Sequence, residues 1–166
     1  MNREYLMKAR TLLMNVAPMA RDCGRSCGAA CCQPDEDGQG GVYLFPGEEE
    51  LLGEIAWGKV AEDSAVLGGK RARMLVCEGM CEREKRPLGC MIFPLTPRLG
   101  EDGRVDVGFD LRARTMCPLL RYGMTGLRRD FVSAVREALG WIARDEEGLR
   151  FLRDWEALER QYNLKL

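Results

Sequence analysis

The chain has 166 residues, of which 46% are hydrophobic and 31% are charged, and its formal net charge is −1. These values predict a folded single domain spanning residues 1–166, and the balanced charge excludes a general electrostatic attraction to nucleic acid or membranes. The chain contains eight cysteines and no histidine, which excludes histidine-based zinc sites and Ser-His or Cys-His nucleophile pairs.

The N-terminal half alternates between helical patterns and loops. Hydrophobic spacing predicts a helix over residues 3–17. After the first cysteines, residues 33–41 are acidic and glycine-rich and predict an exposed loop. The apolar residues 42–45 suit a strand. A helix is expected over residues 48–56, because three glutamates begin this segment and the helix dipole favours negative charge there.

The second half is predicted to contain two strands and then two helices. Residues 73–77 form a candidate strand, and Asp102-Gly103 predicts a hairpin turn that leads into a strand at Val105. Apolar stripes predict one helix over residues 127–142 and another over residues 145–162, which Asp145 would cap. The predicted fold class is α+β, with a small irregular cysteine-rich metal-binding core flanked by N- and C-terminal helices.

Whether the cysteines form disulfides or bind metal depends on the redox state of the compartment in which the protein folds. Residues 1–5 are polar, and no early apolar run resembles a signal peptide. No stretch reaches the roughly 18 apolar residues that span a bilayer. We therefore expect a cytoplasmic protein with neither membrane nor nucleic acid as a partner, in which clustered cysteines bind metal more often than they form disulfides. Four structural disulfides are the alternative in an oxidising compartment.

The cysteines fall into two groups of four along the chain. The first group spans residues 23–32 with the spacing C-x3-C-x3-C-C, and the second combines residues 77–90 with the distant Cys117. The candidate metal ligands are Cys23, Cys27, Cys31, Cys32, Cys77, Cys81, Cys90 and Cys117. A tetrahedral zinc site and a cubane iron–sulfur cluster each need four thiolates, so the eight thiols could fill two sites, or one site with four to spare.

The adjacent pair Cys31 and Cys32 bears on how the thiols divide. Neighbouring side chains point in different directions in a helix or a strand, which indicates two sites or one cysteine that is not a ligand. A continuous helix over residues 21–32 would place Cys23, Cys27 and Cys31 on one face. In that arrangement Cys32 would be turned aside.

The spacing favours an iron–sulfur cluster, of the 4Fe-4S type, over zinc. Common zinc ribbons use C-x2-C pairs, which this chain lacks, whereas sulfur-only ligation and a Cys-Pro pair at Cys117 suit iron–sulfur chemistry. Zinc accepts four thiolates equally well and stays open as a cofactor.

Two other residue types have explanations of their own. Arg86, between two candidate ligands, could offset the charge of a thiolate site or pair with a carboxylate. The tryptophans, Trp57 included, are expected to be packing residues.

The cysteine motifs resemble those of a family of zinc- or iron-chelating cysteine-cluster domains, often called YkgJ-like, to which flagellin lysine methylases are related. The family's later block, C-x4-R-P-x2-C-x2-F-P, is matched at every fixed position by residues 81–94, and Cys77 and Cys117 match the flanking cysteines. The early group has one extra residue in each gap of the usual C-x2-C-x2-C-C. The resemblance covers residues 23–117 and implies a bound metal or iron–sulfur cluster, but not by itself a methylase.

Three functions remain open from the sequence. In the first, the protein chelates an iron–sulfur cluster and has an electron-transfer or accessory role with an unknown protein partner. In the second, the metal is structural zinc in an interaction module. In the third, the protein is a cluster-dependent, methylase-like enzyme, whose metal should have only three cysteine ligands and an open position, whereas a structural site is closed by four.

Overall fold

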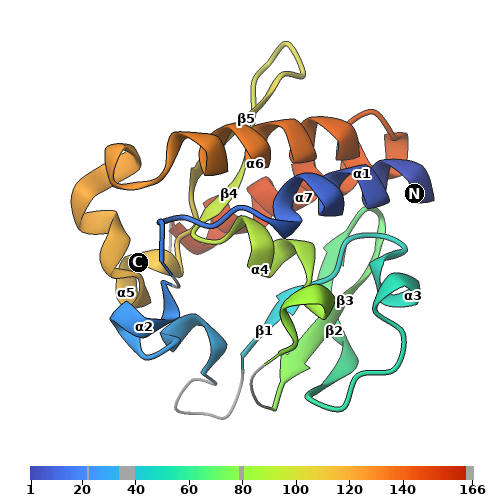
Figure 1. The fold of residues 1–166 in the computed structure, drawn as a ribbon. Coiled ribbons are helices and arrows are strands. Elements are labelled where there is room, and N and C mark those ends of the chain that lie inside the picture. The colour runs from blue at the N-terminus through green and yellow to red at the C-terminus, as the bar shows by residue number, and fades with distance from the viewer. Residues whose placement is uncertain (22, 34–39, 79–80, 164–166) are drawn as a thin grey trace.

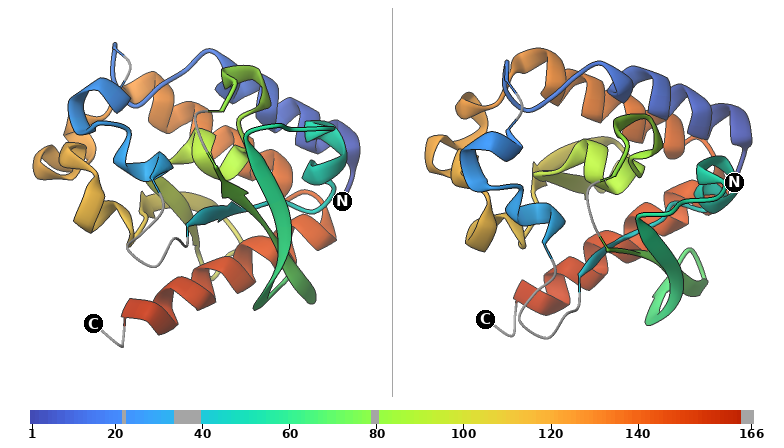
Figure 2. Two further views of the ribbon diagram at one scale, coloured as in Figure 1. Left: turned by 90° about the horizontal axis from the view of Figure 1, so that it is seen from below. Right: turned by 60° about the horizontal axis from the view of Figure 1, so that its bottom comes forward.

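Two of the long helices lie side by side, and a third lies apart from them on the other side of the strands (Figure 1 and Figure 2). The N-terminal helix α1 (Arg3–Met14) packs along α6 (Arg129–Ile142), and α7 (Glu146–Asn163) packs against strands of both sheets. The structure, a computed structural model, describes residues 1–21, 23–33, 40–78 and 81–163. No helix within these ranges is both long and apolar enough to cross a membrane.

The other helical elements are short. The α-helices among them are α2 (Gly24–Cys27), α3 (Glu48–Leu52), α4 (Leu88–Ile92) and α5 (Ala113–Met116). The 3-10 helices are η1 (Ala30–Cys32), η2 (Arg83–Lys85) and η3 (Pro118–Gly126). Figure 2 shows α2 and η1 beside α5, and η1 and α5 are in contact.

The strands form two separate antiparallel sheets. In the first, β3 (Lys70–Cys77) lies between β1 (Gly41–Tyr43) and β2 (Gly58–Leu67). The second is a hairpin of β4 (Leu95–Leu99) and β5 (Val105–Phe109). The mixture of helices and antiparallel sheets confirms the predicted α+β class.

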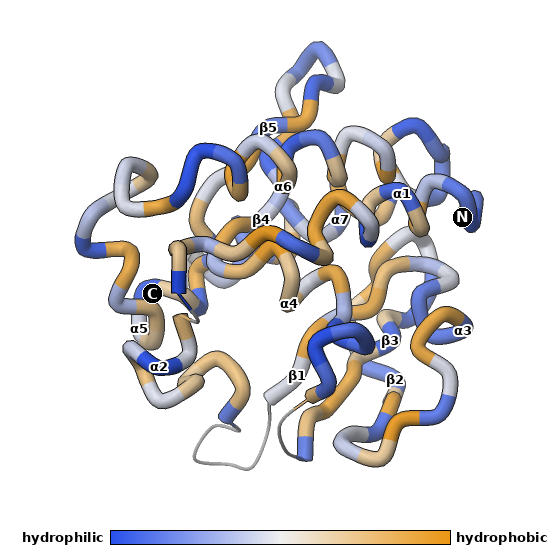
Figure 3. The backbone as a smooth tube through the Cα atoms, viewed as in Figure 1, coloured by the Kyte–Doolittle hydropathy of each residue, from blue (hydrophilic) through white to orange (hydrophobic). Residues whose placement is uncertain are grey.

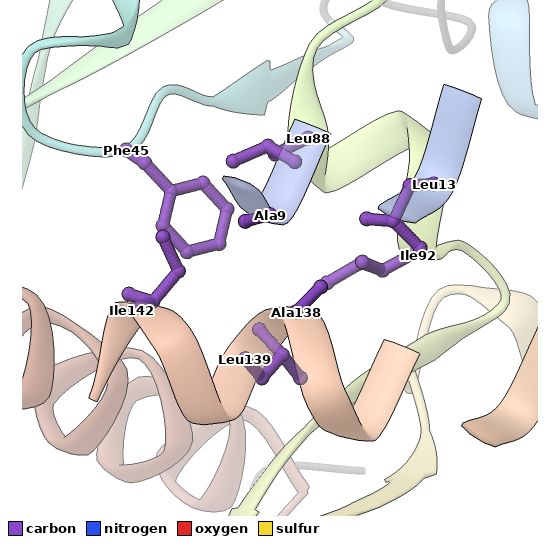
Figure 4. A pocket seen from close by; sticks show the side chains of 8 residues that line it. All are labelled: Ala9, Leu13, Phe45, Leu88, Ile92, Ala138, Leu139 and Ile142. Carbon is purple, nitrogen blue, oxygen red and sulfur yellow. The ribbon is translucent and has the colours of Figure 1, made fainter. Parts of the chain in front are cut away.

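The main core lies where α1, α4, α6 and α7 meet. It is built from the apolar stripes of these helices, so that Phe131, Val135 and Leu152 are fully buried. Figure 4 shows a gap between α1, α4 and α6 whose lining side chains are all apolar. It leaves no room for a water molecule and is a packing gap in the core, not a ligand site. Figure 3 shows the contrast between hydrophilic η2 and the hydrophobic α4 that follows it.

The predicted C-terminal helices and the hairpin at Asp102-Gly103 are confirmed. The Asp145 carboxylate accepts a hydrogen bond of 3.1 Å from the N–H of Gly148, as expected of a cap. Two N-terminal predictions were too long: α1 stops at Met14, and α3 stops at Leu52 because Gly53 turns to a φ of 60°. The predicted loop is outside the described residues at positions 34–39, and its last residue, Gly41, begins β1.

β2 and the start of β3 were not predicted from the sequence. The two strands are joined by Gly68 and Gly69, whose φ angles are 66° and 77°. Two consecutive residues with positive φ form the tight turn that matches the twist of a hairpin, and glycine adopts it without strain. The Gly-Gly pair was therefore the signal from which this hairpin could have been predicted.

Candidate metal centre

The fold brings cysteines from distant parts of the chain to the same region. They come from the α2–η1 segment, the end of β3, the segment that leads into α4, and the residue after α5. Figure 2 shows these segments close together. All eight cysteines are in the described part of the chain, each as a thiol rather than half of a disulfide. Among the described residues no disulfide is present, so this arrangement gives no support to the alternative of four structural disulfides.

A small pocket collects half of the thiols, which we call the first sulfur group. Its members are Cys23, Cys27, Cys31 and Cys117. The remaining lining is apolar and includes Phe93, Met116 and Leu119. Burial raises the pKa of the Cys117 thiol, and the nearby Cys27 raises it further. Three cysteines from the early cluster thus meet one that is far away in sequence.

A break in the helix, not a continuous helix, forms this pocket. The segment does not form the continuous helix over residues 21–32 that the sequence left open, because Gly28 and Ala29 both adopt left-handed backbone angles, with φ of 62° and 56°. The chain reverses there and continues as η1, which returns Cys31 to the pocket that Cys23 lines. A left-handed alanine is strained, and such strain is typical of sites where the surrounding structure imposes the conformation.

The other four thiols make the second sulfur group, which is Cys32, Cys77, Cys81 and Cys90. Cys77, Cys81 and Cys90 pack against a small apolar cluster formed by β1, β3 and the residues before β2. Burial raises the pKa of Cys90, and the neighbouring Cys77, Cys32 and Cys81 raise it further. These thiols are therefore harder to ionise together than free cysteines, unless cations stabilise the thiolates.

Arg86 supplies one positive charge to the second sulfur group. Burial disfavours its charged form, but its pKa is raised overall because its guanidinium donates a hydrogen bond to Cys81 and lies near Cys90 and Cys32. In the part of the chain that the structure describes, no carboxylate forms an ion pair with Arg86, so the alternative of a carboxylate partner is not supported. Arg112, which the sequence analysis did not single out, also lies near Cys90, while Asp110 binds its guanidinium at 2.6 Å.

The two sulfur groups meet at Cys31 and Cys32. A hydrogen bond between these two thiols and partial burial raise the pKa of Cys31, and the nearby Cys32, Cys23 and Cys90 raise it further, so Cys31 also lies near a second sulfur of the other group. Among the described residues that line the pocket of the first group, Cys32 is absent. Its thiol nevertheless contacts that of Cys31, so the expectation that the two side chains diverge holds only in part.

The donor chemistry of both groups fits a thiolate-bound metal centre, because each offers four soft sulfur ligands. A tetrahedral zinc ion, with Zn–S bonds of about 2.3 Å, would bring its four sulfurs to within about 3.8 Å of one another. Among the described residues, no three Cys, Asp or Glu side chains are arranged to hold a single metal ion. A cubane cluster holds its thiolates further apart, because the iron and sulfide core lies between them.

The methionines beside cysteines behave as packing residues where they are described. Met91 is buried in the main core, Met116 lines the first pocket, and Met80 is outside the described residues.

Comparison with known proteins adds nothing to these assignments: no protein-family model, curated protein or solved structure matches the chain. Membership of the cysteine-cluster family stays a prediction from the motifs.

Proposed function

We propose that this chain is a cytoplasmic metal-binding protein that holds iron–sulfur clusters through its two sulfur groups and acts in electron transfer or as an accessory to a partner protein. One observation carries the proposal. Thiols from four separate segments assemble into two groups of four, with an arginine beside the second. Scattered cysteines that served only as small hydrophobic residues would not produce this pattern.

The number of thiols and their arrangement support clusters more than the alternatives. A cubane cluster brings its own sulfide core and takes four thiolates, which is the number that each group offers. A methylase-like enzyme would need an open coordination position, whereas each group here offers a complete set of four thiols. Structural zinc at closed four-thiolate sites is therefore the second candidate.

Metal analysis of one anaerobic preparation tests the proposal. We expect visible absorption and equal amounts of iron and sulfide, at about eight of each per chain if both groups hold a cubane cluster. About two zinc ions per chain with no sulfide would instead establish the structural zinc module. A chain that stays folded and takes up neither metal from iron, sulfide or zinc solutions would overturn both.

A further inference from the structure

The indole N–H of Trp57 is a buried donor that has no acceptor in the described part of the chain. The Trp57 side chain is 9% exposed, and its indole Nε1 has no hydrogen-bond partner among the residues that the structure describes. A buried N–H that has lost water and gained no acceptor is costly, so an unsatisfied donor in a native fold calls for an explanation. The sequence analysis assigned Trp57 to packing, because nothing in the sequence indicates where its N–H points.

The apolar surroundings of Trp57 include three cysteine sulfurs. Trp57 belongs to the small apolar cluster against which Cys77, Cys81 and Cys90 pack. The other members are Val42, Leu44, Leu52 and Leu75, with Ile55 and Val60 packed against them. None of these aliphatic side chains can accept a hydrogen bond. The sulfurs of Cys77, Cys81 and Cys90, in contrast, are acceptors that lie against the same cluster.

The backbone fixes Trp57 next to the same sulfur group. The Trp57 carbonyl accepts a hydrogen bond of 2.9 Å from the N–H of Glu78, the residue after Cys77. In the sheet, Gly58 pairs directly with Cys77. A Cβ at residue 58 would lie only 2.7 Å from the Val76 carbonyl oxygen, so the glycine allows the two strands this close approach. Trp57 and Cys77 are thus held together by main-chain hydrogen bonds that do not depend on a metal.

We propose that the indole N–H of Trp57 donates a hydrogen bond to a metal-bound sulfur of the second sulfur group. This inference rests on the proposed function, because a metal-bound thiolate or sulfide carries negative charge and is a stronger acceptor than a thiol. Such a bond withdraws negative charge from the sulfur, which stabilises a reduced cluster and strengthens the bound state. Trp57 is then a positioning residue that tunes the centre without being a ligand.

Two conservative substitutions test this role. Trp57→Phe keeps an aromatic ring and removes the N–H, while the control Trp155→Phe alters a tryptophan that is 3% exposed in the main core beside Phe45 and Phe151. Both variants and the wild type are loaded with iron and sulfide. The iron content, the reduction potential and the rate of metal release to a chelator are then measured for each.

We expect Trp57→Phe to retain its metal, to have a lower reduction potential, and to release the metal of the second group about 10-fold faster, as for a lost hydrogen bond to a charged acceptor. Trp155→Phe should match the wild type in potential and release. A Trp57→Phe protein with the potential and release rate of the wild type would overturn the inference alone. A wild type that binds no metal would overturn the proposed function as well.

A measurement on the wild type tests the same hydrogen bond without any substitution, and it therefore applies even if Trp57→Phe does not fold. With isotope-labelled tryptophan, NMR follows the exchange of each indole proton with solvent, before and after loading with cadmium, which thiolates bind as they bind zinc. We expect loading to slow the exchange of the Trp57 proton and shift its resonance, and to leave that of Trp141 unchanged. Equal exchange of the Trp57 proton in the two states would contradict the proposed bond.

Discussion

Arg10 and Glu48 form an ion pair in the interior, with 3.1 Å between Nη1 of Arg10 and Oε1 of Glu48. The two Glu48 oxygens also accept hydrogen bonds from the N–H groups of Leu88, at 2.6 Å, and Phe45, at 3.0 Å. The same guanidinium donates to the carbonyls of Glu84 and Arg86, which precede α4. The pair therefore ties α1 and α3 to the segment that carries Cys81 and Cys90.

Replacing Glu48 should weaken the fold strongly. Glu48→Gln leaves the buried Arg10 charge without its partner, and breaking a buried pair from one side typically costs about 3 kcal/mol. The free energy of unfolding in urea measures this loss. The control is Glu49→Gln, which removes an ion pair with Arg73 that is exposed on both sides and should cost about 1 kcal/mol or less. If Glu48→Gln and Glu49→Gln lost the same free energy of unfolding, the buried ion pair would contribute no more to stability than the exposed one.

Single cysteine variants should separate the two sulfur groups. Cys27→Ala removes a thiol of the first group and Cys90→Ala one of the second, so each should lose about half of the bound metal and part of the stability that metal binding supplies. Iron and sulfide analysis, with thermal unfolding in parallel, gives both quantities. Loss of all metal in either variant would indicate one shared site, and unchanged metal in both would argue against the ligand assignment.

Removing the Arg86 charge should weaken the second group only. Arg86→Gln takes away the guanidinium that donates to Cys81, and a hydrogen bond to a charged sulfur is worth about tenfold in affinity. Chelator competition measures the affinity. Arg83→Gln is the matched control from the same segment, because Arg83 is exposed and only reaches the Val16 carbonyl at 3.5 Å. If both variants bind metal equally well, Arg86 has no role in charge balance.

Gly89 allows α4 to pack closely on β1, and an alanine there should disturb both the fold and Cys90. Its Cβ would collide with Cγ2 of Val42 and lie 3.3 Å from the Tyr43 carbonyl oxygen. Overpacking of this kind costs about 2 kcal/mol. Gly140→Ala in α6 is the control: its Cβ meets nothing within 4 Å, so the higher helix propensity of alanine should stabilise the protein by about 0.8 kcal/mol. Denaturant unfolding distinguishes the two, and a neutral Gly89→Ala would show that α4 can move away from β1 freely.

The helices could be predicted from sequence because an amphipathic stripe is a local property. Residues such as Phe131, Val135 and Ile142 recur with the period of a helix wherever the rest of the chain lies. β2 offered no comparable signal. Its exposed and buried residues do not alternate regularly, and its register with β3 shifts between Glu62 and Val66. In the sequence, only the Gly68-Gly69 turn indicated the hairpin of β2 and β3.

For the candidate site, the sequence identified the cysteines but not their grouping. Cys117 joins Cys27 because α5 packs on η1, and the sequence does not reveal that contact. Cys32 joins Cys77 and Cys90 because the chain reverses at Gly28 and Ala29. The unsatisfied N–H of Trp57 could not be predicted either, since it depends on which side chains surround the indole.

The placement of Cys31 and Cys32 has a mechanical consequence. A single peptide unit separates the residue that carries a sulfur of one group from the residue that carries a sulfur of the other, and the two thiols are in contact. If both sets of thiols bind metal as proposed, a shift of the backbone that adjusts Cys31 is passed directly to Cys32, so this peptide is the shortest covalent route between the two centres.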